Sequence, residues 1–229
     1  MKKFLMLLLL ILFFSAVIIS RSSASESSVI SDDIREKERK ITENISEQVE
    51  KQMQRVTDPA AEKKLSEVTA KIKPHMGREL KYEVRMIKRD DPHAFSLPGG
   101  LTYITTGMLD FLRSDHELSA VLAREFTHSD LSHWLIQSSR NEKIDFKKMA
   151  EVAAATQSGK VAGNMVRTYL NRAVINFYDI DLEKETDLRA LEIMKKAGYN
   201  NVGLLTYIER MRIERLKQLY VRGIDIRYK

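Results

Sequence analysis

Cysteine is absent from the sequence, and this absence removes several kinds of site at once. It excludes disulfide bonds, thiol catalysis, cysteine-ligated zinc and a lipid anchor on an N-terminal cysteine. Proline (4) and glycine (9) are scarce in the 229 residues, which favours helix over turn-rich β structure. Hydrophobic residues still make up 43% of the chain, so its length and composition suit one domain with a core plus a targeting segment.

A strong charge of one sign is also missing. The formal net charge is +6, and Lys2, Lys3 and Arg21 near the N-terminus account for three of these charges, which leaves +3. Such a small excess does not indicate a nucleic-acid partner, and the sequence contains no glycine-rich or aromatic RNA-binding motif. We therefore expect no nucleic acid among the partners.

One long apolar run occurs, and it lies at the N-terminus. Residues 4–19 follow a short basic stretch and precede Ser22-Ser23-Ala24, a spacing of small residues that is typical of signal-peptide cleavage. A secretory signal peptide of residues 1–24 is the first interpretation. An uncleaved membrane anchor is the alternative, since the run approaches the roughly 17 residues that a spanning helix needs. Both place the rest of the chain outside the cytoplasm, with residues 25–32 disordered and 33–229 forming one domain.

The apolar periodicity of that domain predicts a mostly helical α+β fold. A four-residue spacing of apolar side chains predicts a helix from about residue 33 to 56. Asp58 and Pro59 suit the cap and first position of a second helix, which should run to about Ile72. Alternating residues from Leu80 to Ile87, followed by short apolar runs on both sides of Pro98-Gly99-Gly100, predict a small three-stranded sheet.

The stretch from Ser114 to His133 predicts a central helix with chemistry on one face. Ser114 and Glu117 form an S-x-x-E capping box at its start. Residues 124–128, Arg-Glu-Phe-Thr-His, differ from the zinc-peptidase signature H-E-x-x-H only at the first position. In that signature two imidazoles one turn apart hold the ion, and the glutamate takes a proton from the bound water. The partial match is weak on its own.

Two further helices follow in the C-terminal part. Glu183 and Asp187 are four residues apart and share a face of a helix that Gly198 should end. A last helix runs from Val202 to about Tyr220 and leads into a basic tail. A solvated surface is the plainer interpretation of that tail, and contact with an anionic membrane surface is the alternative.

Four blocks of sequence, in order, resemble one family. His93 to Gly100 (HAFSLPGG) is similar to N-A-F-x-L-P-G-G, and residues 103–112 (YITTGMLDFL) are similar to the strand and helix that follow it. Residues 115–133 resemble D-E-L-A-x-V-L-A-H-E-x-x-H-x-x-x-x-H, and residues 183–187 resemble E-x-E-A-D. The family is that of the CAAX prenyl protease and HtpX-like gluzincins, the forty-eighth metallopeptidase family, among them its secreted bacterial members.

The resemblance implies a zincin-like metallopeptidase domain, with zinc as the cofactor and export to the bacterial periplasm or cell envelope. Glu125 corresponds to the general base, and His128 and Glu183 correspond to zinc ligands. Asp187 is implied as a neighbour of the ligands. His133 lies about 140° round the helix from His128, so it is expected to support the site and not to bind the metal.

The same resemblance points to a surface for substrate. The segment formed by Leu97, Pro98, Gly99 and Gly100 is expected to offer a strand edge to an extended peptide. An ordinary hairpin without such a role is the alternative.

Arg124 occupies the position of the missing histidine ligand. A guanidinium group stays protonated and offers no lone pair to a metal. At an effective dielectric of about 20 it would repel a dication about 4 Å away by roughly 8 kcal/mol. It can instead pair with the carboxylates of Glu183 and Asp187, and of Glu125, through forked hydrogen bonds.

Two hypotheses follow from this substitution. One is an exported, zinc-deficient relative that binds polypeptide or a protein partner in the former active-site cleft. The other is an active zinc-dependent metalloendopeptidase that degrades misfolded or membrane-associated proteins.

Overall fold

The computed structural model describes residues 35–140 and 178–221. The chain divides into two compact units, residues 1–40 and 41–229, and the architecture below is that of the second. The expected signal peptide, the expected disordered segment and the sequence between residues 141 and 177 lie outside the described residues. Within the described parts, no helix has both the length and the apolar character that crossing a membrane requires.

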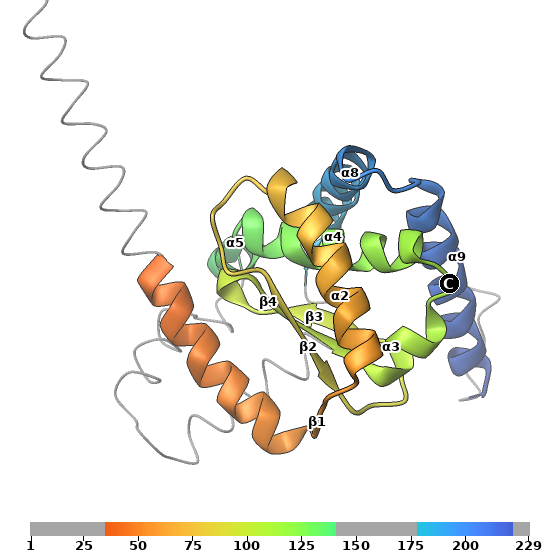
Figure 1. Ribbon diagram of the computed structural model, residues 1–229, viewed down its shortest axis with the longest axis horizontal. Helices are drawn as coiled ribbons and strands as arrows, with labels where there is room; N and C mark the ends of the chain where they lie inside the picture. The colour runs from red at the N-terminus through yellow and green to blue at the C-terminus, as the bar shows by residue number, and fades with distance from the viewer. Residues whose placement is uncertain (1–34, 141–177, 222–229) are drawn as a thin grey trace, which may run out of the picture. The chain divides into compact units, whose positions relative to one another are not determined.

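Helices dominate the fold, and α4 lies at its centre (Figure 1). It packs against α2, α8 and α9 on its helical sides and against β3 of the sheet. Within the described residues, the helices after the first are α2 (Pro59–Ile72), α3 (Thr106–Phe111), α4 (Asp115–Asp130), α5 (His133–Arg140), α8 (Ile180–Lys196) and α9 (Val202–Val221). The predicted helix at the start of the domain covers residues 35–52. A mostly helical α+β domain is therefore confirmed.

The sheet has four strands, one more than the sequence predicted. They are β1 (Arg55–Val56), β2 (Glu83–Ile87), β3 (Ala94–Ser96) and β4 (Leu101–Thr105), in the order β1-β2-β4-β3. The β2–β4 pair is parallel, and the other two pairs are antiparallel. Strand β1 was missed because two residues are too short to show a periodicity, and it takes the place of the predicted last turn of the preceding helix.

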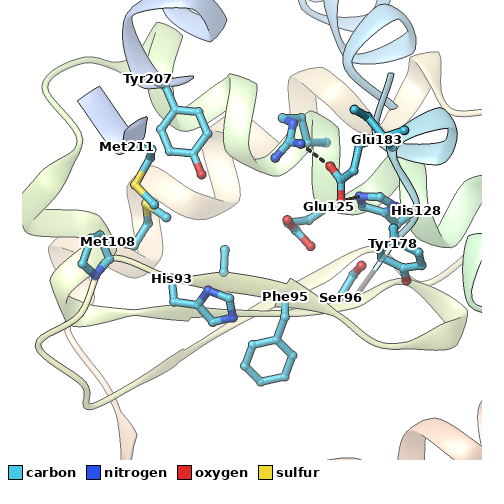
Figure 2. Close-up of a pocket in the computed structure, with 14 residues that line it drawn as sticks. His93, Phe95, Ser96, Met108, Glu125, His128, Tyr178, Glu183, Tyr207 and Met211 are labelled. Atoms are coloured by element: carbon cyan, nitrogen blue, oxygen red, sulfur yellow. Dashed lines mark hydrogen bonds and ion pairs between the residues drawn. The ribbon is translucent and has the colours of Figure 1, made fainter. Parts of the chain in front are cut away.

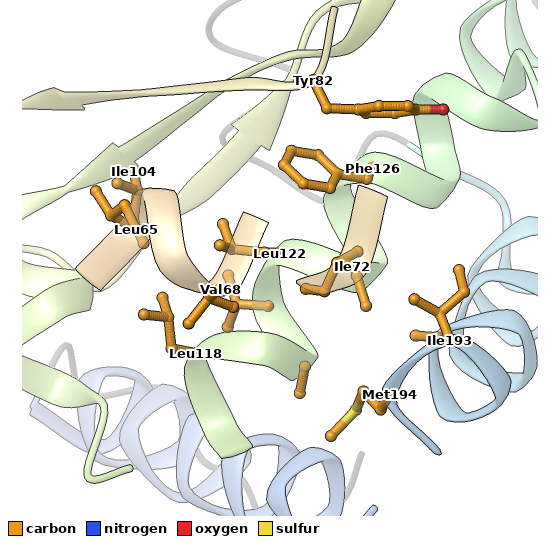
Figure 3. Close-up of a cluster of buried hydrophobic side chains, with 14 of the residues drawn as sticks. Leu65, Val68, Ile72, Tyr82, Ile104, Leu118, Leu122, Phe126, Ile193 and Met194 are labelled. Carbon is orange, nitrogen blue, oxygen red and sulfur yellow. The ribbon is translucent and has the colours of Figure 1, made fainter. Parts of the chain in front are cut away.

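Two apolar clusters hold these elements together. In the larger one, side chains of α2, α4 and α8 pack together beside the sheet (Figure 3). Its fully buried members include Ile72, Leu122, Phe126, Ile193 and Met194. The smaller cluster joins the predicted stripe of the first helix to β3, β4 and α5; it contains Ile41, Ile45, Val49, Phe95, Tyr103 and Trp134. The larger cluster fixes the position of α4 relative to the sheet, and the smaller one packs the first helix against the strands.

The central helix begins as predicted but ends earlier. The Glu117 N–H donates to Ser114 Oγ at 3.3 Å, which confirms the cap. The helix stops at Asp130 and not at His133, because Ser132 takes a left-handed conformation with φ 52°. After this change of direction α5 begins at His133, which brings the His133 ring to the site.

The end of α4 is tied to the loop before β2 by Asp130. Its carboxylate, 6% exposed, accepts from the Gly77 and Arg78 amides at 3.0 and 2.7 Å and from the Tyr82 hydroxyl at 2.9 Å. Hydrogen bonds to a charged group contribute about 1.5–3 kcal/mol each, not additively. We expect Asp130→Ala to lower the free energy of unfolding by about 3 kcal/mol in urea denaturation.

The matched control is Asp110→Ala. Asp110 is exposed on α3, and a surface substitution of this kind should stay within about 0.5 kcal/mol of the wild type. Equal stability of the two variants would show that the Asp130 contacts contribute little.

Candidate functional site

A pocket of about 440 Å³ lies between α4, the β3 strand, α8 and α9 (Figure 2). It brings together Arg124, Glu125, His128 and Glu183, which the sequence had placed in one site from two distant segments. The remaining lining residues are Pro92, His93, Ala94, Phe95, Ser96, Met108, Tyr178, Ile180, Tyr207 and Met211.

Arg124 joins α4 to α8 through two short ion pairs. Its Nε donates to Asp187 Oδ1 at 2.6 Å, and its Nη2 donates to Glu183 Oε2 at 2.5 Å. Burial would lower the pKa of Arg124, but Tyr207, Glu183 and Asp187 raise it above its ordinary value, so the guanidinium stays charged. The predicted fork to two carboxylates is therefore present.

Glu125 lies in the same pocket, but its hydrogen-bond partner is Ser96. Burial raises its pKa to about 7, with Glu183 adding to the rise, while Arg124 and hydrogen bonds from Ser96 act in the opposite direction. At neutral pH the carboxyl group is therefore divided between its charged and neutral forms. A carboxyl with such a pKa suits the exchange of protons near pH 7.

His128 and His133 form a contacting pair. Their Nδ1 atoms are 3.0 Å apart, and the Thr186 hydroxyl lies within 3.4 Å of both. The Tyr178 ring stacks on His128, with centroids 4.0 Å apart and an interplanar angle of 8°. The structure thus places His133 beside His128. The cause is the change of chain direction at Ser132, which the geometry of a continuous helix did not indicate.

The contacts of the histidine pair favour one set of tautomers. His133 Nε2 makes no hydrogen bond within the described residues, but it lies 3.4 Å from Glu185 Oε2, and the charge of this carboxylate favours a proton on that nitrogen. His133 Nδ1 then accepts a hydrogen bond from the Nδ1–H of His128. In this arrangement His128 Nε2 carries a lone pair, and it lies 3.9 Å from Glu183 Oε1.

The strand edge at the pocket differs from the expected one. Leu97 and the turn Pro98–Gly100 are mostly buried, and the Leu97 and Pro98 carbonyls accept from the hydroxyls of Ser129 and Thr42. These two carbonyls therefore already accept hydrogen bonds from side chains of the protein. The pocket is lined by residues 92–96, so β3, and not the turn of residues 97–100, is the part of this segment that lies beside it.

The backbone of β3 has groups that turn away from its neighbour. The Leu97 amide donates to Leu101 at 2.7 Å, and the Thr105 amide donates to His93 at 3.0 Å. In an antiparallel ladder alternate residues bond to the same neighbour, so the N–H and C=O groups of Ala94 and Ser96 point toward the other edge, where the Ser96 N–H donates to Glu125. Among the described residues, no further strand pairs with that edge.

The donor set does not fit a catalytic zinc ion. Such sites use three protein ligands and keep one position open. Here His128 Nε2 and Glu183 Oε1 can donate lone pairs, but Arg124 cannot, and it holds the second oxygen of Glu183. Among residues 35–140 and 178–221, no group of three or more histidine or acidic side chains is arranged to bind a metal.

Comparison with known proteins gives one family. The sequence model of peptidase family M48 matches residues 47–220. The chain is 30% identical over 135 residues to the mitochondrial metalloendopeptidase OMA1 of Schizosaccharomyces pombe, covering 58% of this chain and 38% of that protein. It is 24% identical over 135 residues to the metalloprotease YcaL of Escherichia coli, covering 59% and 52%. The chain thus spans about half or less of the length of these curated relatives.

Proposed function

Because the chain belongs to peptidase family M48, a family of zinc-dependent metallopeptidases, we propose that it is a zinc-deficient member that binds polypeptide in the former active-site cleft. The observation that carries the proposal is the double ion pair of Arg124 with Glu183 and Asp187. A group with no lone pair takes the place of a ligand and uses a neighbouring ligand as its own partner. Arg124 then links α4 to α8, as a metal bound by both helices would.

The electrostatics of the pocket support the same conclusion. A zinc ion bound by His128 and Glu183 would lie close to a fixed positive charge that burial does not neutralise. Binding would also require the short Arg124–Glu183 hydrogen bond to break, and charge-assisted bonds of this kind are among the stronger ones in proteins. The loss of a ligand, the repulsion by Arg124 and the breaking of the Arg124–Glu183 hydrogen bond all oppose the binding of zinc.

The β3 edge supports the binding of polypeptide. An extended peptide can add to an open strand edge through backbone hydrogen bonds and place alternate side chains in neighbouring pockets. The outward groups of Ala94 lie beside the pocket, so a peptide that pairs with Ala94 would direct a side chain into it, whereas Ser96 is already hydrogen-bonded to Glu125. The relatives are named as a metalloendopeptidase and a metalloprotease, whose substrates are polypeptides.

We extend the proposal to the location of the protein. The apolar run of residues 4–19 and the small residues after it support export, with the bacterial periplasm or cell envelope as the destination. The polypeptides bound there would be misfolded or membrane-associated proteins, and a membrane surface is a further candidate partner.

The test combines metal content with peptide binding. We expect elemental analysis of the purified full chain to give less than about 0.1 zinc per chain, since a site with two lone-pair donors falls short of the usual three protein ligands. Fluorescence polarisation should show binding of unfolded casein without its digestion. Ala94→Pro removes an outward N–H of β3 and should weaken casein binding about tenfold without changing the thermal midpoint.

Two results would contradict the proposal. About one zinc per chain together with casein digestion would support the alternative, an active metalloendopeptidase in which Glu125 takes a proton from water. Equal casein affinity of the wild type and a folded Ala94→Pro variant would place the bound polypeptide elsewhere than on β3.

A further inference from the structure

The pocket carries more negative than positive charge. Of the described residues that line it, Glu125 and Glu183 are acidic, and Asp187 lies directly behind Arg124. Arg124 is the one arginine or lysine among the described residues of that lining, and it forms ion pairs with Glu183 and Asp187. A carboxylate or phosphate ligand would add to the excess of negative charge, whereas a monocation would reduce it.

A second observation points to a ligand that donates hydrogen bonds. The His128 ring is only 3% exposed, and its Nε2 faces the pocket with no hydrogen-bond partner among the described residues. The contacts of His133 leave a lone pair on that nitrogen. A ligand that supplies an N–H could donate a hydrogen bond to this nitrogen.

Three acceptors face one space. They are His128 Nε2, Glu183 Oε1 and the Glu125 carboxylate, whose side chains converge on the right-hand part of the pocket in Figure 2. Glu183 Oε1 is available because Arg124 takes the other oxygen. An ammonium group has three N–H donors and no acceptor, so its bonding capacity matches this set. It also carries half the charge of a zinc ion and is repelled half as strongly by Arg124.

The opposite end of the pocket suits an aliphatic stem. Met108, Tyr207 and Met211 form this end, away from the acceptors (Figure 2). Thioether side chains adapt to irregular apolar groups, and a lysine buries its methylene stem along such surfaces while its head remains in polar surroundings. Tyr178, stacked on His128, adds an aromatic ring close to the position of the charge.

We propose that the pocket recognises a primary ammonium group of the polypeptide bound at β3, either a lysine side chain or the N-terminal amino group. This inference rests on the proposed function, since the polypeptide brings the amine to the pocket. It names the feature by which the cleft selects among polypeptides. Glu125, His128 and Glu183 bind the ammonium group, while Arg124 holds Glu183 in place.

The test uses short synthetic peptides and the full chain in isothermal titration calorimetry. One peptide has a blocked N-terminus and a central lysine, a second carries acetyl-lysine at the same position, and a third has a free N-terminus and no lysine. We expect the lysine peptide or the free N-terminal peptide to bind at least about tenfold more tightly than the acetyl-lysine peptide. The peptide that shows the preference identifies the source of the amine.

Glu125→Gln provides the matched variant, because it keeps the shape of the side chain and removes the charge. It should abolish most of the preference, whereas Glu192→Gln on the exposed side of α8 should leave it unchanged. A preference that persists in a folded Glu125→Gln variant would overturn the assignment to this pocket. Equal binding of all three peptides would refute ammonium recognition while peptide binding stands, and no binding of any peptide would refute both proposals.

Discussion

Replacing Arg124 with histidine should convert a chain that retains little zinc into one that holds about one zinc ion. The variant would offer lone pairs from positions 124 and 128 of α4 and from Glu183 of α8, which makes the three protein ligands of a catalytic zinc site. It would also remove a repulsion of roughly 8 kcal/mol at an effective dielectric of about 20. Even if relaxation of the structure absorbs half of that energy, the affinity for zinc should rise at least about 10³-fold.

Activity should follow the metal in this variant. Glu125 lies between the two ligand positions on the helix, and its pKa of about 7 suits a general base. We expect Arg124→His to digest casein in a reaction that a chelator stops, while the wild type shows no such activity. Elemental analysis and release of labelled casein fragments measure the two effects separately.

Arg124→Lys is the control for this substitution. It keeps a positive charge at the site and should stay free of zinc and inactive. If Arg124→His also stays free of zinc, His128 and Glu183 are not placed to act as ligands and the metal was lost for another reason. If it binds zinc but leaves casein intact, the rest of the catalytic machinery has been lost as well.

Sequence patterns gave the elements that carry the site but not every contact within it. The helix with Glu183 and Asp187 could be predicted because acidic residues four apart share a face and Gly198 provides a left-handed end, observed here with φ 80°. The pairing with Arg124 could be predicted from charge, since a guanidinium at a ligand position lies close to the carboxylates that would otherwise surround the metal.

The contact between His128 and His133 could not be predicted in the same way. A continuous helix would have turned the two rings apart, and the reversal occurs at Ser132, a residue type that rarely takes a positive φ. The spacing of the eight tyrosines does not show which of them line the pocket, and the structure places Tyr178 and Tyr207 there. Such contacts depend on tertiary packing and leave no local signal.

Replacing Arg124 with methionine should destabilise the fold by about 2–4 kcal/mol. Methionine fills a similar volume but leaves the Glu183 and Asp187 side chains, 32% and 35% exposed, without their counter-charge. Removing one partner of a buried ion pair costs about 3–5 kcal/mol, and the partial exposure of the two carboxylates reduces that figure. Urea denaturation at pH 7.5 or thereabouts measures the loss.

The pH dependence of this variant identifies the origin of the loss. Burial raises the pKa of Glu183 above 4.5, Arg124 lowers it, and Asp187 raises it, so removal of Arg124 should raise it further. A carboxyl group with a raised pKa in the folded state loses stability as the pH rises from its unfolded value through its folded value. The penalty of Arg124→Met should therefore be largest above about pH 7 and shrink as the pH falls toward about 5.

A triple variant in which the unpaired carboxylates are also neutralised tests whether charge causes the loss of stability. Adding Glu183→Gln and Asp187→Asn to Arg124→Met replaces the unpaired carboxylates by neutral groups of the same shape, and it should restore at least half of the lost stability at neutral pH. The two amides can also bond to each other across the same face of α8. A penalty that is constant with pH and is not relieved by these changes would show that Arg124 stabilises the fold by packing, and the view that its charge replaces a metal would then be wrong.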